Sequence, residues 1–130
     1  MKEQKVSFKT AKLAKEKGFD WECTDGYGSE GTEYFLEDYE DGDILFDNWN
    51  HLEYRYESDR TCCISAPTQS LLQKWLREKH NYHLWIIPWN SCKDFAYNWE
   101  YNGMNDGSKG IFKSYEEALE EGLYEALKLI

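Results

Sequence analysis

Residues 66–86, APTQSLLQKWLREKHNYHLWI, decide the fold because a helical pattern runs directly into an aromatic strand. Apolar side chains recur at helical spacing and predict one buried helix face, made of Leu71, Leu72, Trp75 and Leu76. Ser65 or Thr68 is the expected N-cap of this helix. Pro67 suits its first turn, and Asn81 suits its end. We therefore expect the helix to be scaffold, with its basic side chains in solvent.

The residues that follow predict a β-hairpin. Residues 82–89, YHLWIIPW, and residues 95–101, FAYNWEY, are both rich in the aromatic and β-branched side chains that strands favour. A loop containing Asn90 and Asp94 joins them. Pro88 has no N–H to donate, which places the first strand at a sheet edge or near a strand end.

Two further helices are expected, one on each side of this centre. Residues 7–17 form the first, with Ser7 or Thr10 as its cap, Gly18 as a left-handed terminator and Phe19 as the hydrophobic contact that follows it. Residues 114–130 form the last, and they carry a capping box and one apolar stripe. The box is Ser114 with Glu117, and the stripe is Leu119, Leu123, Ala126, Leu127 and Ile130.

An acidic segment spans residues 20–60, with fourteen acidic residues against two basic ones. Three runs within it predict a meander of antiparallel strands with an acidic outer face: residues 33–39, 43–49 and 52–58. The Asp41-Gly42 pair between the first two is a hairpin signal.

These elements, taken in order, predict an α+β fold. About three helices pack on one face of a largely antiparallel sheet, which consists of the meander plus the hairpin. A chain of 130 residues with 41% hydrophobic side chains can bury its own core. We expect a single domain over residues 1–130.

Composition limits the classes of partner. The formal net charge of −10 repels phosphate backbones, so we expect no direct nucleic-acid binding. No apolar run approaches the roughly 20 residues of a membrane span, and no apolar leader follows the first lysines. We expect no membrane partner and a cytoplasmic location. Aromatic residues, 17% of the chain, are enriched at binding surfaces.

The nucleophilic and metal-ligating side chains lack the spacing that chemistry requires. The four cysteines contain no CxxC pair, and His80 and His83 span the end of the predicted helix rather than one of its faces. Cys63 or Cys92 with His83 is the least implausible dyad, but no nucleophile elbow surrounds either thiol. We therefore predict no catalytic residues, no metal site and no cofactor, and the sequence leans against an enzyme without deciding the question.

Two sets of residues are candidates for binding. A ligand would contact aromatic side chains of the hairpin with basic groups near them: His83, Trp85, Trp89, Tyr97, Trp99 and Arg77. A partner protein would contact acids of the meander: Glu37, Asp38, Glu40, Asp41 and Asp43. In the competing interpretation, the aromatic side chains only cover the helices and the acids only face solvent. Mimicry of a nucleic acid by the carboxylates is left open by the sequence.

Three segments carry a resemblance: AKLAKEKGFD, APTQSLLQKWLREKHNYHLWI and SYEEALEEGLYEALKLI. Together they resemble small uncharacterised proteins of phages and prophages of gut Bacteroides-type bacteria. The resemblance covers both ends and the centre of the chain, and it does not extend to residues 21–60. That family has no established activity, so the resemblance implies no catalytic or ligand residues. It implies an accessory protein of a virus or mobile element that acts inside a bacterial host.

The sequence therefore favours a non-enzymatic phage or prophage accessory protein that binds a host protein through an acidic, aromatic surface. The alternative is a small-ligand-binding, sequestering module, or a minimal enzyme with an aromatic-lined pocket. A homodimer formed through the aromatic surface is a third interpretation. The residues identify neither the partner nor the ligand, the biological process or the oligomeric state.

Overall fold

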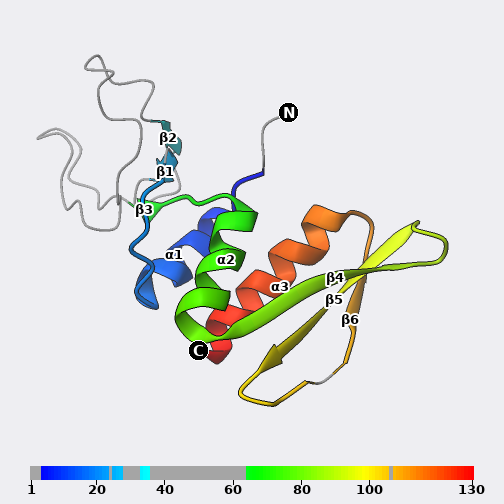
Figure 1. Ribbon diagram of the computed structural model, residues 1–130. Coiled ribbons are helices and arrows are strands. Elements are labelled where there is room, and N and C mark those ends of the chain that lie inside the picture. The colour runs from blue at the N-terminus through cyan, green and yellow to red at the C-terminus, as the bar shows by residue number, and fades with distance from the viewer. Residues whose placement is uncertain (1–3, 24, 28–32, 36–63, 106) are drawn as a thin grey trace, which may run out of the picture. The chain divides into compact units, whose positions relative to one another are not determined.

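The computed structural model describes residues 4–23, 25–27, 33–35, 64–105 and 107–130 (Figure 1). They divide into two compact units, Lys5–Pro67 on one side and Met1–Gln4 with Thr68–Ile130 on the other. The described residues of the two units form three helices and two antiparallel sheets. The predicted α+β class is thus confirmed, whereas the single domain over residues 1–130 stays a prediction.

The first helix, α1 (Phe8–Glu16), begins and ends as predicted. The hydroxyl of its N-cap, Ser7, accepts a hydrogen bond from the Thr10 backbone N–H at 3.3 Å. At the other end Gly18 has φ +95°. The N–H groups of Gly18 and Phe19 donate to the carbonyls of Lys15 and Ala14 at 3.1 and 3.0 Å, which is the Schellman pattern.

A small sheet completes this unit, with strand order β2-β1-β3. Its strands are β1 (Asp25–Tyr27), β2 (Glu33–Phe35) and β3 (Ile64–Ser65). The Tyr27 hydroxyl donates to the Val6 carbonyl at 2.7 Å, and its ring meets that of Phe8 edge to face. Only residues 33–35 of the predicted meander belong to the described residues; its remainder, including the turn at Asp41, lies outside them.

In the larger unit, α2 (Gln69–His80) has Thr68 as its N-cap, and Asn81 ends it with φ +53°. Two details of the prediction are wrong. Ser65 is not a cap because it pairs with β1 as part of β3, and Pro67 precedes the cap instead of lying in the first turn. The predicted apolar face is confirmed, since Leu72, Trp75 and Leu76 are buried and Leu71 is half-buried.

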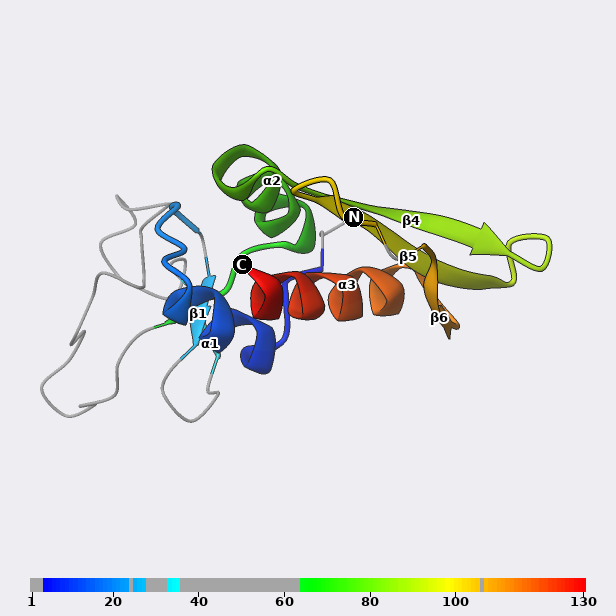
Figure 2. The same cartoon turned by 90° about the horizontal axis from the view of Figure 1, so that it is seen from below.

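The second sheet has strand order β4-β5-β6, with all pairs antiparallel (Figure 2). Strands β4 (Tyr82–Trp89) and β5 (Asp94–Tyr101) are the predicted hairpin, and Pro88 lies on the edge strand as expected. Asp94 is the first residue of β5 and not part of the loop. The short strand β6 (Lys109–Phe112) was not predicted.

A tight turn follows β5. Asn102 and Gly103 both have positive φ, +51° and +77°, and Tyr101 and Met104 exchange two backbone hydrogen bonds around them. These are the properties of a type I′ hairpin turn, for which Asn-Gly is the preferred pair.

The last helix, α3 (Tyr115–Leu129), has the predicted N-cap. The Ser114 hydroxyl accepts from the Glu117 N–H at 3.1 Å, while the Glu117 carboxylate accepts from the N–H of Lys113 at 3.3 Å. The carboxylate thus reaches one residue beyond the cap itself. The apolar stripe is buried over most of its length, at Leu119, Leu123, Ala126 and Leu127.

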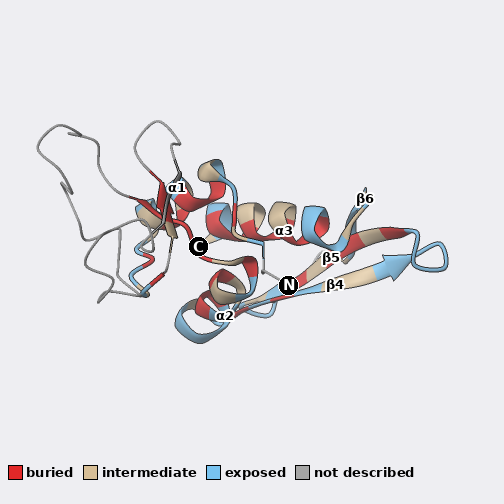
Figure 3. Ribbon diagram, turned by 90° about the horizontal axis from the view of Figure 1, so that it is seen from above, coloured by how far each residue is buried: buried red, intermediate tan, exposed pale blue. Residues whose placement is uncertain are grey.

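Helix α3 lies along one face of the β4-β5-β6 sheet (Figures 2 and 3). It approaches the sheet closely at Gly122, where an added Cβ would lie 2.8 Å from Leu84 Cδ1 and 3.1 Å from Tyr97 Cγ. Glycine therefore allows the helix to rest directly on these two side chains. Helix α2 contacts both β4 and α3.

We expect Gly122→Val to lower the free energy of unfolding by about 1–3 kcal/mol more than Glu121→Val, because only the first adds volume against the sheet. The neighbouring change controls for the helix propensity of valine. Urea unfolding followed by circular dichroism measures both. Equal losses in the two variants would contradict the close packing at Gly122.

The hydroxyl of Tyr82 has no hydrogen-bond partner among the described residues, although its side chain is only 1% exposed. Its ring stacks on Trp99 at 5.7 Å, and burial raises the pKa of the phenol, so it remains protonated. We expect Tyr82→Phe to leave the free energy of unfolding unchanged or raise it by up to about 1 kcal/mol, since an unpaired buried hydroxyl is removed. Tyr82→Ala should cost about 3–5 kcal/mol. A destabilised Phe variant in thermal unfolding would show that the hydroxyl has a partner.

Candidate functional site: the outer face of the hairpin

The β4–β5 hairpin has two chemically different faces, because side chains alternate along a strand. One face carries Leu84 and Tyr97 against α3, so we call it the inner face. On the opposite side the pairs His83–Glu100 and Trp85–Asn98 face each other. Together with Ile87 and Trp89 they form what we call the outer face.

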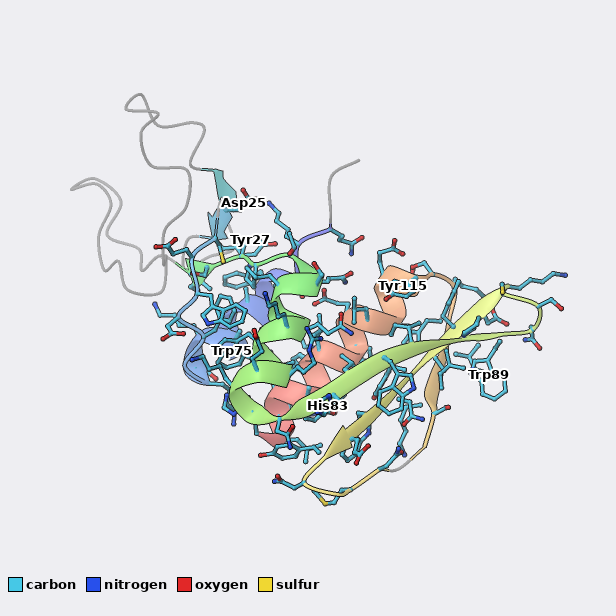
Figure 4. The ribbon with its side chains drawn as sticks, in the orientation of Figure 1. Asp25, Tyr27, Trp75, His83, Trp89 and Tyr115 are labelled. Atoms are coloured by element: carbon cyan, nitrogen blue, oxygen red, sulfur yellow. The ribbon has the colours of Figure 1, made fainter. Side chains whose placement is uncertain are left out.

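The outer face exposes large aromatic side chains. Trp85 is 39% exposed and Trp89 is 47% exposed. Figure 4 shows His83 at the end of β4 near α2 and Trp89 at the end near the hairpin tip. The two are six positions apart along the strand, which is about 20 Å at 3.3 Å per residue. The face therefore offers a long strip rather than an isolated aromatic group.

One end of this strip forms an open cavity of about 420 Å³. Its lining combines one indole with polar and charged groups: Asn81, His83, Trp85, Glu100, Asn102 and Gly103. The Nε2 of His83 donates to the Asn81 carboxamide oxygen at 3.0 Å, which fixes the imidazole at the wall. The cavity thus presents an aromatic surface next to a carboxylate.

The structure separates the six residues that the sequence grouped as a ligand site. His83, Trp85 and Trp89 lie on the outer face. Tyr97 and Trp99, each 7% exposed, lie on the inner face. Arg77 is exposed on α2 and does not line the cavity. A single pocket containing all six residues is therefore not formed.

Four lining residues were missed by the sequence grouping: Asn81, Glu100, Asn102 and Gly103. Three of them have left-handed backbone, which asparagine and glycine adopt more readily than most residues. The Asn102-Gly103 pair was the available signal for a tight turn. The partner-binding acids Glu37, Asp38, Glu40, Asp41 and Asp43 lie outside the described residues.

The structure describes the thiols of Cys23 and Cys92, whereas Cys63 lies outside the described residues. Cys23 is buried, and desolvation raises the pKa of its thiol to about 12, so the nucleophilic thiolate does not form at neutral pH. Cys92 lies at the tip of the hairpin and His83 at its base, so about 20 Å of strand separates the suggested pair. Within the described ranges no cluster of three or more His, Cys, Asp or Glu side chains could hold a metal ion.

The free edge of β4 is protected against pairing with another strand. Gln73 Nε2 donates to the backbone carbonyl of Leu84 at 2.7 Å, which occupies that acceptor from the side of α2. Further along the strand, Pro88 offers no N–H. Proline and capping of edge groups are devices that prevent strand addition. Two backbone positions of this edge are thus unavailable for pairing with another strand.

At the other end of the hairpin, a cluster around Asp94 holds an unusual turn. Asn90, Ser91 and Cys92 all have left-handed backbone, with φ of +49°, +56° and +69°. The Asp94 carboxylate accepts from Asn90 Nδ2 at 2.7 Å and from Lys113 Nζ at 3.0 Å. It therefore links the turn to the segment that precedes α3.

No family model, curated protein or solved structure matches this chain. None of the helices among the described residues is both long and apolar enough to cross a membrane.

The hydrogen bond from Asn90, followed by that from Lys113, lowers the pKa of Asp94. A lowered pKa in the folded state stabilises the fold above the ordinary carboxyl pKa of about 3.9, and this contribution disappears as pH falls through the folded value. Asp94→Asn should therefore lower the melting temperature at pH 7. The difference from the wild type should narrow below about pH 4.

Thermal unfolding of both proteins at pH 7, 5 and 3 measures this difference. Glu78→Gln, which alters an exposed carboxylate on α2, serves as the control and should show little difference at any pH. A deficit of Asp94→Asn that stays constant from pH 7 to pH 3 would argue against the charged role of Asp94.

Proposed function

We propose that this protein works by binding another protein, with the outer face of the hairpin as the contact surface. One observation carries the proposal: Trp85 and Trp89 lie on the same strand face and remain 39% and 47% exposed. Tryptophan is the residue type most enriched among the energetic centres of protein interfaces. The protected edge of β4 supports a contact made by side chains and not by strand addition.

The free energy gained by burying the indoles of Trp85 and Trp89 is too small to hold a complex by itself. An aromatic side chain can bury roughly 150–250 Å², so the exposed parts of the two indoles amount to about 130–215 Å². Covering them would contribute about 3–5 kcal/mol. Association alone costs about 4–15 kcal/mol, so a stable complex needs further contacts. The nearest groups that could supply these contacts are Ile87, which lies between the two indoles on the strand, and the polar cavity beside Trp85.

The resemblance to phage and prophage proteins of Bacteroides-type bacteria supports a host protein as the partner. In this proposal the chain is a non-enzymatic accessory protein of a phage or prophage and acts in the cytoplasm of its host. The acids Glu37, Asp38, Glu40, Asp41 and Asp43 contribute a second, electrostatic part of the contact. Facing a basic surface on the partner, these carboxylates would increase the rate and selectivity of association more than its strength.

A second candidate function is the binding of a small molecule in the cavity on the outer face. The volume of about 420 Å³ lies within the usual range of ligand sites. A thermal-shift screen with nucleotides and common metabolites tests this candidate. A saturable rise in melting temperature that is lost in Trp85→Ala would favour it over a protein partner.

The double variant Trp85→Ala/Trp89→Ala should lose binding to the partner, because each truncation at an interface centre costs more than about 1 kcal/mol. Partners captured by the wild type from host lysate are identified by mass spectrometry. Their affinity is then measured with purified components, and we expect a loss of at least tenfold. The control is Leu129→Ala, which truncates an apolar side chain that is 43% exposed on α3.

Binding that withstands the double variant, or that falls equally in Leu129→Ala, would refute the outer face as the contact surface. A second variant, in which all five acids are replaced by Asn or Gln, tests the electrostatic part of the contact separately. A slower association with little change in dissociation is expected there, and an unchanged association rate at low salt would remove the acids from the proposal.

A further inference from the structure

We infer that the cavity beside Trp85 receives the cationic head of an arginine or lysine side chain from the partner protein. This inference deepens the proposed function and rests on it. The cavity is lined by the indole of Trp85, the carboxylate of Glu100 and the imidazole of His83. It is the polar end of the outer face, adjoining the apolar strip that leads to Trp89.

The strand register brings the indole and the carboxylate to the same place. Glu100 is paired with His83 across the strands, and Trp85 is two residues further along β4 on the same face. Diagonal neighbours of this kind are about 7–8 Å apart at Cα, a distance that long side chains span. A cation between them would contact the face of the indole and the carboxylate oxygens at once, and both attract positive charge.

The charges around the cavity favour a cation over other ligands. No ion pair engages Glu100 among the residues with described positions, so its carboxylate has no cation of its own there. The Nε2 of His83 is committed to Asn81. Burying an unpaired carboxylate under a neutral ligand would be costly, and an anion would be repelled. The formal charge of −10 on the whole chain also attracts cations and repels anions.

A side chain of a protein fits the cavity better than a free amine does. The cavity is open to solvent and continues into the exposed indole strip, so a partner lying on Trp85 and Trp89 can extend a long basic side chain into it. Arginine is enriched at protein interfaces, and its planar guanidinium stacks on aromatic faces while it donates to a carboxylate.

Two peptide probes test the inference: acetyl-Gly-Arg-Gly-amide and the same peptide with citrulline, which has nearly the same shape without the charge. Both are titrated into the full-length protein, and binding is followed by NMR at the indole N–H of Trp85 and at the backbone N–H of Asn102, which lines the same cavity and remains present in Trp85→Ala. We expect the arginine peptide to bind about threefold or more tightly than the citrulline peptide. Glu100→Gln should remove this preference, and Trp85→Ala should weaken the arginine peptide by a similar factor.

The control is Glu78→Gln, which makes the same charge change on α2 and should keep the preference for arginine. A cavity that binds both peptides equally well in the wild type would overturn the inference. So would a loss in Glu78→Gln as large as that in Glu100→Gln, because attraction would then follow net charge alone. Melting curves of each variant verify that it is folded.

Two further results separate this inference from the proposal on which it rests. If the captured partner binds Glu100→Gln as tightly as the wild type but fails to bind Trp85→Ala/Trp89→Ala, the outer face is a contact surface and the cation site is refuted. If tetramethylammonium shifts the Trp85 signal at lower concentration than the arginine peptide, a small free cation and not a protein side chain is the ligand, and the inference is wrong.

Discussion

The contact of α3 with the sheet at Gly122 determines which face of the hairpin is exposed to solvent. An added Cβ there would overlap Leu84 and crowd Tyr97, so the helix backbone itself lies against these side chains. Because side chains alternate along β4, fixing Leu84 under the helix sends His83 and Trp85 to the other side. The exposure of the tryptophans is thus a consequence of packing on the opposite face, and the outer face exists only while α3 holds that position.

The helix limits could be predicted because the interactions that set them are local. Ser7, Thr68 and Ser114 each accept a hydrogen bond from the N–H three residues later, and these three pairs can be found in the sequence alone. The choice between Ser65 and Thr68 could not be made in this way. It depends on the pairing of Ser65 with Gly26, which is distant in the chain. Local chemistry thus identified both candidates, and a long-range strand pairing selected one of them.

The composition of the candidate site could not be predicted, because it depends on the register of the hairpin. Trp89 pairs with Asp94, so odd-numbered residues of β4 share a face with even-numbered residues of β5. Trp85 and Trp89 are therefore separated from Tyr97 and Trp99 by the thickness of the sheet. A connection with one residue more or fewer would have placed all four aromatic side chains on one side. The sequence shows which residues alternate within each strand. It does not show which residues of β4 share a face with which residues of β5, because the left-handed turn at residues 90–92 sets this register.

The cavity arises where the two strands end together, and this explains both its openness and its polar lining. Tyr82 pairs with Tyr101, so Asn81 and Asn102 flank the last pair on either side. Both have left-handed backbone, one as the end of α2 and the other within the type I′ turn, and the chain leaves the sheet at each of them. His83 and Glu100 are the last pair on the outer face, because the side chains of Tyr82 and Tyr101 lie on the inner face. The strand that follows this turn, β6, is short and irregular: Gly110 has φ +76°, and the pairing with β5 shifts register between Phe95 and Tyr97. Its residues show no alternation of apolar and polar side chains, so the sequence did not predict it. Glu100, which has no ion-pair partner among the described residues, is thereby left beside an exposed indole at the open end of the hairpin.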